Sequence, residues 1–145
     1  MLNRSLLFAG LIFSQLSLGI HWEVIGQESK EPAFKGTTLV DLKQSVGDAT
    51  IRILTENKIP YLGTAAGINS ILNTPTGDAA IKVLSDDSMR VYGWCYEVDG
   101  VEPPKMPDAY LFPSQESTIT WFFAYSLYEH GKWVECCTPA YKNPL

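Results

Sequence analysis

The chain has 145 residues, of which 46% are hydrophobic, and it carries a formal net charge of −5. This length suits one domain with an ordinary core. The acidic balance and the lack of any Lys/Arg run exclude a nucleic-acid partner, because such a partner needs a basic surface to neutralise its phosphates. They equally disfavour binding to anionic lipid.

The first segment has the pattern of an export signal. One positive charge precedes an apolar run from Ser5 to Ile20, and the small residues Ser17 and Gly19 stand two apart. This pattern predicts a signal peptide over residues 1–19, cleaved after Gly19, and a single domain over residues 20–145 in the periplasm or outside the cell. The alternative is an uncleaved anchor, but the run is shorter than the roughly 20 residues that span a bilayer.

The first half of the domain contains strand patterns and one helix pattern. Alternation predicts strands over Ile20–Ile25 and Thr37–Val46. The segment Asp48–Ile59 has both strand and helix periodicity, and we favour a helix with Asp48 as its N-cap, ended by Pro60. A short apolar piece over Ile68–Leu72 follows.

The second half contains two hairpin patterns. Ala79–Leu84 and Met89–Val98 flank a polar four-residue turn, and Thr118–Tyr128 and Lys132–Cys137 flank a turn with Gly131. The four prolines between Val101 and Pro113 predict a surface loop rather than a central strand. We expect the tail after Cys137 to be loosely held.

Aromatic residues are concentrated in these hairpins. The strand Thr118–Tyr128 is apolar on both faces, so it is either central in a covered sheet or offers one face to a partner. In the preceding strand, the aromatic side chains of Tyr92, Trp94 and Tyr96 share one face. That face is either core, stabilised by cross-strand aromatic pairs, or a ligand platform. The candidate ligand-binding residues are Tyr92, Trp94, Tyr96, Asp99 and Trp121.

Three cysteines allow one disulfide and leave one thiol over. Cys136 and Cys137 are adjacent, so on a strand they point to opposite faces and only one can face Cys95. We take Cys95–Cys136 as the candidate pair, with Cys95–Cys137 as its alternative. Three buried free thiols are the remaining possibility.

The sequence gives little support for catalysis. Its two histidines, His21 and His130, lie near the new N-terminus and in a turn, and no nucleophile elbow or Cys-His signature is present. We expect no enzyme, no catalytic residues and no cofactor. A weaker alternative is a copper site, because cleavage after Gly19 would place His21 second in the mature chain.

Several motifs resemble those of a family of exported bacterial domains related to the C-terminal β-domain of transcobalamin, largely of unknown function. The most specific is Trp94–Gly100, similar to the family's Trp-x-Tyr-x-Val-Asn-Gly pattern, with Asp99 in place of Asn. Ala66–Ile71 and Thr118–Tyr125 add to the likeness. The resemblance implies an α+β, β-grasp-like fold: a small mixed sheet on one helix. Transcobalamin's cobalamin site also needs a helical domain not seen in this sequence, so the fold is implied without cobalamin.

These observations predict an exported, non-catalytic binding module of unknown ligand, with the aromatic face as its contact surface. The partner would be a small molecule or another exported protein. The alternative is a structural subunit that pairs through an open sheet edge.

Overall fold

The computed structural model describes residues 18–145. The predicted signal peptide falls almost wholly on residues 1–17 and therefore lies outside the described residues. Strand β1 begins at Ile20, directly after the predicted cleavage point. Within residues 18–145, no helix has the length and apolar character needed to cross a membrane.

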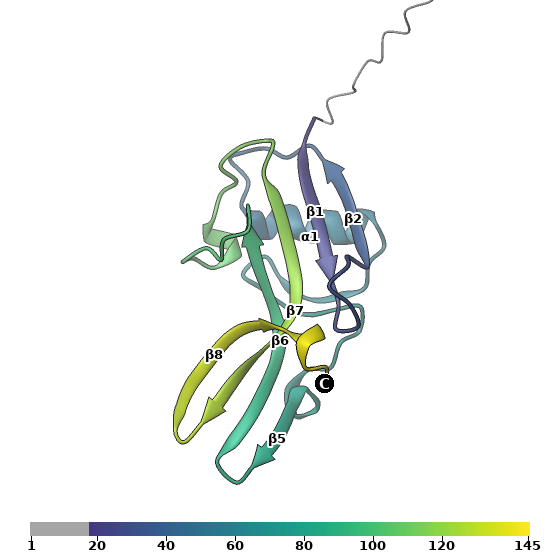
Figure 1. Ribbon diagram of the computed structural model, residues 1–145. Helices are drawn as coiled ribbons and strands as arrows, with labels where there is room; N and C mark the ends of the chain where they lie inside the picture. The colour runs from purple at the N-terminus through teal and green to yellow at the C-terminus, as the bar shows by residue number, and fades with distance from the viewer. Residues whose placement is uncertain (1–17) are drawn as a thin grey trace, which may run out of the picture.

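The fold is α+β, as predicted, with one α-helix packed on a mixed sheet (Figure 1). The six-stranded sheet has the order β2-β1-β7-β6-β5, and β8 pairs with β7 beyond the end of β1; β3 and β4 form a separate two-stranded sheet. The elements are β1 (Ile20–Ile25), β2 (Phe34–Thr38), α1 (Val46–Glu56), β3 (Tyr61–Thr64), β4 (Gly67–Ile71), β5 (Ile81–Ser85), β6 (Ser88–Val98), β7 (Thr118–Glu129) and β8 (Lys132–Pro139), with short 3-10 turns η1 (Gly77–Ala80), η2 (Pro107–Ala109) and η3 (Ala140–Lys142).

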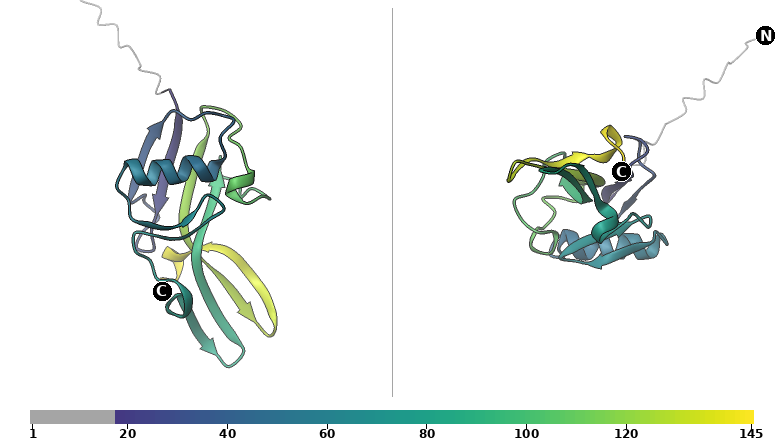
Figure 2. Two further views of the ribbon diagram at one scale, coloured as in Figure 1. Left: turned by 180° about the vertical axis from the view of Figure 1, so that it is seen from behind. Right: turned by 90° about the horizontal axis from the view of Figure 1, so that it is seen from below.

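The topology is β-grasp-like. Strands β1 and β2 form an antiparallel hairpin, the chain then enters α1, and β7 returns to lie parallel to β1. Figure 2 shows α1 crossing one face of this sheet. Its buried residues Ala49, Ile53 and Leu54 pack in one core cluster with Ile20 and Trp22 of β1.

Strand β7 is the centre of the molecule. It pairs with β6 along nearly its whole length, while its other edge pairs first with β1 and then with β8. Phe123, near the point where β8 takes over from β1, is 0% exposed. This central position explains why the strand is apolar on both faces.

The helix begins earlier than predicted, so the assignment of Asp48 as N-cap is wrong. Ser45 is the N-cap: its hydroxyl accepts a hydrogen bond from the Asp48 amide and donates one to the Asp48 carboxylate. The helix is therefore three residues longer at its start than predicted. Asp48 lies in its first turn, where a negative charge stabilises the N-terminal end of a helix.

The predicted strand Thr37–Val46 is also wrong beyond Thr38, where β2 ends. The apolar alternation that suggested a strand belongs to a connecting segment. Within it, Val40 is buried and its main-chain oxygen accepts a hydrogen bond from the Gln115 amide, whereas Leu42 is exposed.

The C-terminal tail is held rather than loose. Strand β8 continues to Pro139, and η3 follows it. Asn143 then accepts a hydrogen bond from the Tyr92 hydroxyl through its main-chain oxygen (2.8 Å) and donates one to the Tyr125 hydroxyl (2.9 Å). These bonds satisfy the hydroxyl groups of two tyrosines that belong to the core cluster around Phe123.

Candidate binding site

The structure places three of the candidate aromatic residues in the core. Tyr92, Tyr96 and Trp121 are 5%, 8% and 4% exposed, and Tyr96 stacks on Trp121 with ring centroids 5.3 Å apart. Their polar tips bond inside the protein: Trp121 Nε1 donates to Thr50 Oγ1 at 3.0 Å, and the Tyr96 hydroxyl donates to the Lys105 carbonyl at 2.6 Å. These side chains join the sheet to α1 and to the proline-rich loop.

Trp94 differs from its neighbours on the same face because it is only partly buried. Its ring contacts Phe123 at a centroid distance of 5.5 Å, and its Nε1 donates to Thr74 Oγ1 at 2.8 Å. It lines three separate hollows on the surface. Of the candidate aromatic residues, Trp94 therefore has the most contact with accessible space.

Asp99 has a structural role in the turn after β6. It is exposed, and its φ of 54° together with that of Gly100 (76°) is the left-handed conformation that tight hairpin turns require. Its Oδ1 accepts a hydrogen bond from the Thr118 amide at 2.8 Å. The carboxylate thus fixes the start of β7 to the end of β6.

The disulfide joins Cys95 to Cys137, so the candidate pairing of Cys95 with Cys136 is wrong and its alternative is correct. Opposite Ser126, β8 supplies two residues, Cys136 and Cys137, where a regular ladder would have one. Cys137 takes a positive φ of 50° in this bulge. The bulge turns the Cys137 side chain to Cys95, across β7, and leaves Cys136 as an exposed free thiol.

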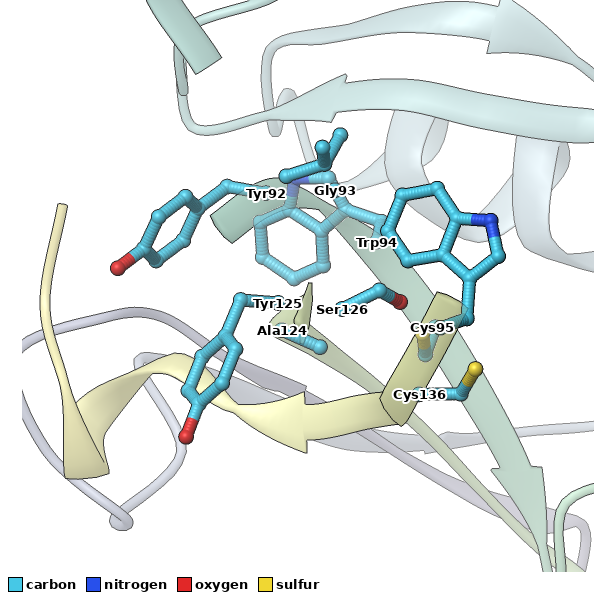
Figure 3. Close-up of a pocket in the computed structure, with 10 residues that line it drawn as sticks. Tyr92, Gly93, Trp94, Cys95, Ala124, Tyr125, Ser126 and Cys136 are labelled. Atoms are coloured by element: carbon cyan, nitrogen blue, oxygen red, sulfur yellow. The ribbon is translucent and has the colours of Figure 1, made fainter. Parts of the chain in front are cut away.

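The first hollow, of about 350 Å³, lies on the sheet face opposite α1, where β8 curls over β7 (Figure 3). Gly93 and Cys95 of β6, Ala124 and Ser126 of β7, and Trp133 and Cys136 of β8 line it. At Gly93 a Cβ would meet nothing within 4 Å, so the missing side chain leaves space in this hollow.

Two further hollows lie beside β6 on the side away from β7. One, of about 650 Å³, lies between η1, the β3–β4 hairpin and residues Val91–Trp94. The other, of about 530 Å³, lies between Trp94–Tyr96 and the loop Glu102–Pro107. The prolines predicted a surface loop here, but their sequence alone gave no sign that the loop forms the wall of a hollow.

Among residues 18–145, two groups have pKa values shifted from their ordinary values. Burial raises the pKa of Tyr96 to about 12. A hydrogen bond from Ser85 lowers the pKa of Asp87, and the contact with His130 Nδ1 lowers it further. Asp87 and His130 are in the exposed turns of the two hairpins, where the His130 amide also donates to the Asp87 carbonyl.

Metal-binding geometry is not apparent in the part of the chain that the structure describes, where no three His, Cys, Asp or Glu side chains gather. His21 lies on β1 with its Nδ1 3.2 Å from Thr37 Oγ1. Cys137 is in the disulfide, so Cys136 alone remains as a thiol ligand.

Comparison of the chain with models of protein families, with curated proteins and with solved structures gives no match.

Proposed function

We propose that this protein is an exported, non-catalytic binding module whose contact surface surrounds Trp94. The observation that carries the proposal is the position of this one aromatic side chain, partly buried and lining the two hollows beside β6 while the other candidate aromatic residues are in the core. A half-exposed indole with an apolar ring and a polar tip is typical of ligand contacts. Export is supported by the signal-like first segment and by the disulfide, which persists in oxidising compartments.

Binding is favoured over catalysis by the chemistry around these hollows. Among residues 18–145, His21 and His130 lie on β1 and in the last hairpin turn, and neither lines the three hollows around Trp94. A nucleophile with a base and an orienting group is what acyl or group transfer needs. The hollows are lined by aromatic rings, small side chains and main chain together with Cys136, Asp78, Glu102 and Lys105, and no histidine lines them.

We also propose that this chain is related to the transcobalamin C-terminal-like family. The motif Trp94–Gly100 forms the end of β6 and its turn, and the β-grasp-like order of elements agrees with the fold that the family implies. Since a fold does not define a ligand, we do not extend this to cobalamin.

The proposal is tested by native mass spectrometry of the mature protein purified from the exported fraction of its own host. We expect a bound small molecule or a bound polypeptide. Gly93→Val is the informative variant, because a Cβ at this position meets no atom within 4 Å and valine suits a strand. Loss of the bound species in this variant, at unchanged thermal stability, places it in the first hollow or in the hollow beside η1, because Gly93 lines both.

A matched control is Trp133→Leu, since Trp133 lines the first hollow but not the two beside β6. If the bound species is retained in Gly93→Val and in Trp133→Leu but lost in Trp94→Leu, the contact lies beside β6. If wild-type protein carries nothing, and Trp94→Leu only lowers stability, the indole is a core residue and the proposal fails.

A further inference from the structure

Strand β6 has a gap in its outer hydrogen-bonding edge. At its start, β5 pairs with it as far as Val91, and at its end Val98 and Val101 bond to each other through both main-chain groups at 2.9 and 3.1 Å. Between these points no strand in residues 18–145 pairs with this edge. The gap is bordered by the two hollows beside β6.

The main-chain groups that face the gap can be assigned from the alternation of a strand. The Val98 amide points outward to Val101, whereas the Asp99 amide donates inward to Thr118 on β7. Successive residues alternate in direction, so the N–H and C=O groups of Trp94 and Tyr96 also point outward. Among the described residues, no hydrogen bond to these four groups is found.

The N–H and C=O groups of Trp94 and Tyr96 provide two donors and two acceptors, spaced as along one edge of a strand. One kind of ligand has the complementary spacing. An extended polypeptide presents the complementary pattern, as it does when a peptide adds a strand to a sheet. We propose, as a refinement that rests on the proposed binding function, that the gap between Val91 and Val98 accepts an extended segment of a partner protein as an added strand.

The walls of the gap indicate which side chains that segment carries. On one side lie Ile68 and Met106, the latter 61% exposed, which suit apolar side chains. On the other side, Glu102 Oε1 is 3.5 Å from Cys137 Sγ, and Glu97 follows Cys95 on the same face of β6. These two carboxylates outnumber Lys105, the one basic residue that lines this hollow. Alternate residues of the added strand would therefore be apolar and basic.

A second copy of this chain is a poorer occupant than a basic segment. Pairing two β6 edges about a two-fold axis would bring two sets of Glu97 and Glu102 together, and each chain already has an excess of acidic residues. The proposal therefore commits to a different chain of opposite local charge.

The free protein provides the first part of the test. Amide hydrogen exchange of the mature monomer, followed by NMR, should show fast exchange at Trp94 and Tyr96 and slow exchange at Cys95 and Glu97, which face β7. Slow exchange at all four positions in a monomer would overturn the proposal, because the edge would then be occupied. Slow exchange that accompanies dimerisation by light scattering would overturn it in favour of self-pairing.

The second part uses defined peptides as probes. We expect a capped nine-residue peptide of alternating Val and Lys to shift the amide resonances of Trp94 and Tyr96 and slow their exchange. The same peptide N-methylated at alternate residues should bind at least tenfold more weakly. A Val/Glu peptide should also bind more weakly, and Glu102→Lys should reverse the preference, whereas the control Glu28→Lys, in a remote exposed loop, should not.

Equal binding of the methylated peptide, or no shift with any peptide at millimolar concentration, would overturn the added-strand proposal. Neither result would affect the test of Gly93→Val and Trp94→Leu against the ligand from the host. Failure of the strand proposal is thus separable from failure of the binding function.

Discussion

Removal of the disulfide should cost the fold a large part of its stability. Cys95 and Cys137 are 42 residues apart in sequence, and closing a loop of that length in the unfolded chain lowers its entropy by about 13 cal/mol/K. At 25 °C this corresponds to about 4 kcal/mol. We expect the double variant Cys95→Ala/Cys137→Ala to lose about that much free energy of unfolding. Cys136→Ala should change it by less than about 0.5 kcal/mol, because its thiol is exposed.

Urea unfolding followed by tryptophan fluorescence measures the difference. With an m-value of about 2 kcal/mol/M, the double variant should have its midpoint lowered by about 2 M while Cys136→Ala keeps the wild-type midpoint. Intact mass with and without thiol alkylation confirms one bridge and one free thiol. A double variant with an unchanged midpoint would refute the loop argument. A similar loss in Cys136→Ala as in the double variant would show that Cys136, not Cys137, is bonded to Cys95 in solution.

Three further changes test other contacts. Ser45→Ala should lower the free energy of unfolding by about 1 kcal/mol through loss of the N-cap; no change in the urea midpoint would restore Asp48 as the cap. Phe123→Ala should cost about 3–5 kcal/mol because the ring is fully buried between Tyr92 and Trp94, and a loss below 1 kcal/mol would contradict its central place. The pKa of Tyr96 in the folded state, about 12, exceeds the unfolded value of 10.0. The contribution of this phenol to the free energy of unfolding is therefore complete below pH 10 and is lost as the pH rises towards 12. The stability difference between wild type and Tyr96→Phe should narrow over that range, and a constant difference would show that the phenol is not perturbed.

The strands were predictable where short polar turns separate strongly β-prone runs. The second hairpin was found from Gly131 and the first from Asp86 and Asp87, because turn chemistry is local. The β3–β4 pair was missed, since Gly63 and Gly67 interrupt its apolar pattern. Gly63 has a φ of 135°, and a Cβ there would lie 2.5 Å from the Gly67 carbonyl oxygen, so this strand needs a residue that usually weakens strands.

The candidate binding site was less predictable than the fold. Alternation correctly put Tyr92, Trp94 and Tyr96 on one face, but burial depends on what covers the face, and α1 with the tail covers all but part of Trp94. The choice between Cys136 and Cys137 depends on a bulge in β8 that regular alternation cannot represent. The gap along β6 arises because β5 stops short, which depends on three-dimensional pairing rather than on any motif.

The parallel pairing of β1 with β7 also affects the order in which the chain can assemble. His21 lies opposite Thr118, which are 97 residues apart in sequence (118 − 21). Contacts of such long sequence separation slow folding, because the entropy of closing the intervening chain is lost before the contacts form. The inner edge of β1 therefore stays without its partner until residues up to Phe122 are available. A chain that is made or threaded from its N-terminus completes this sheet only near the end of the process.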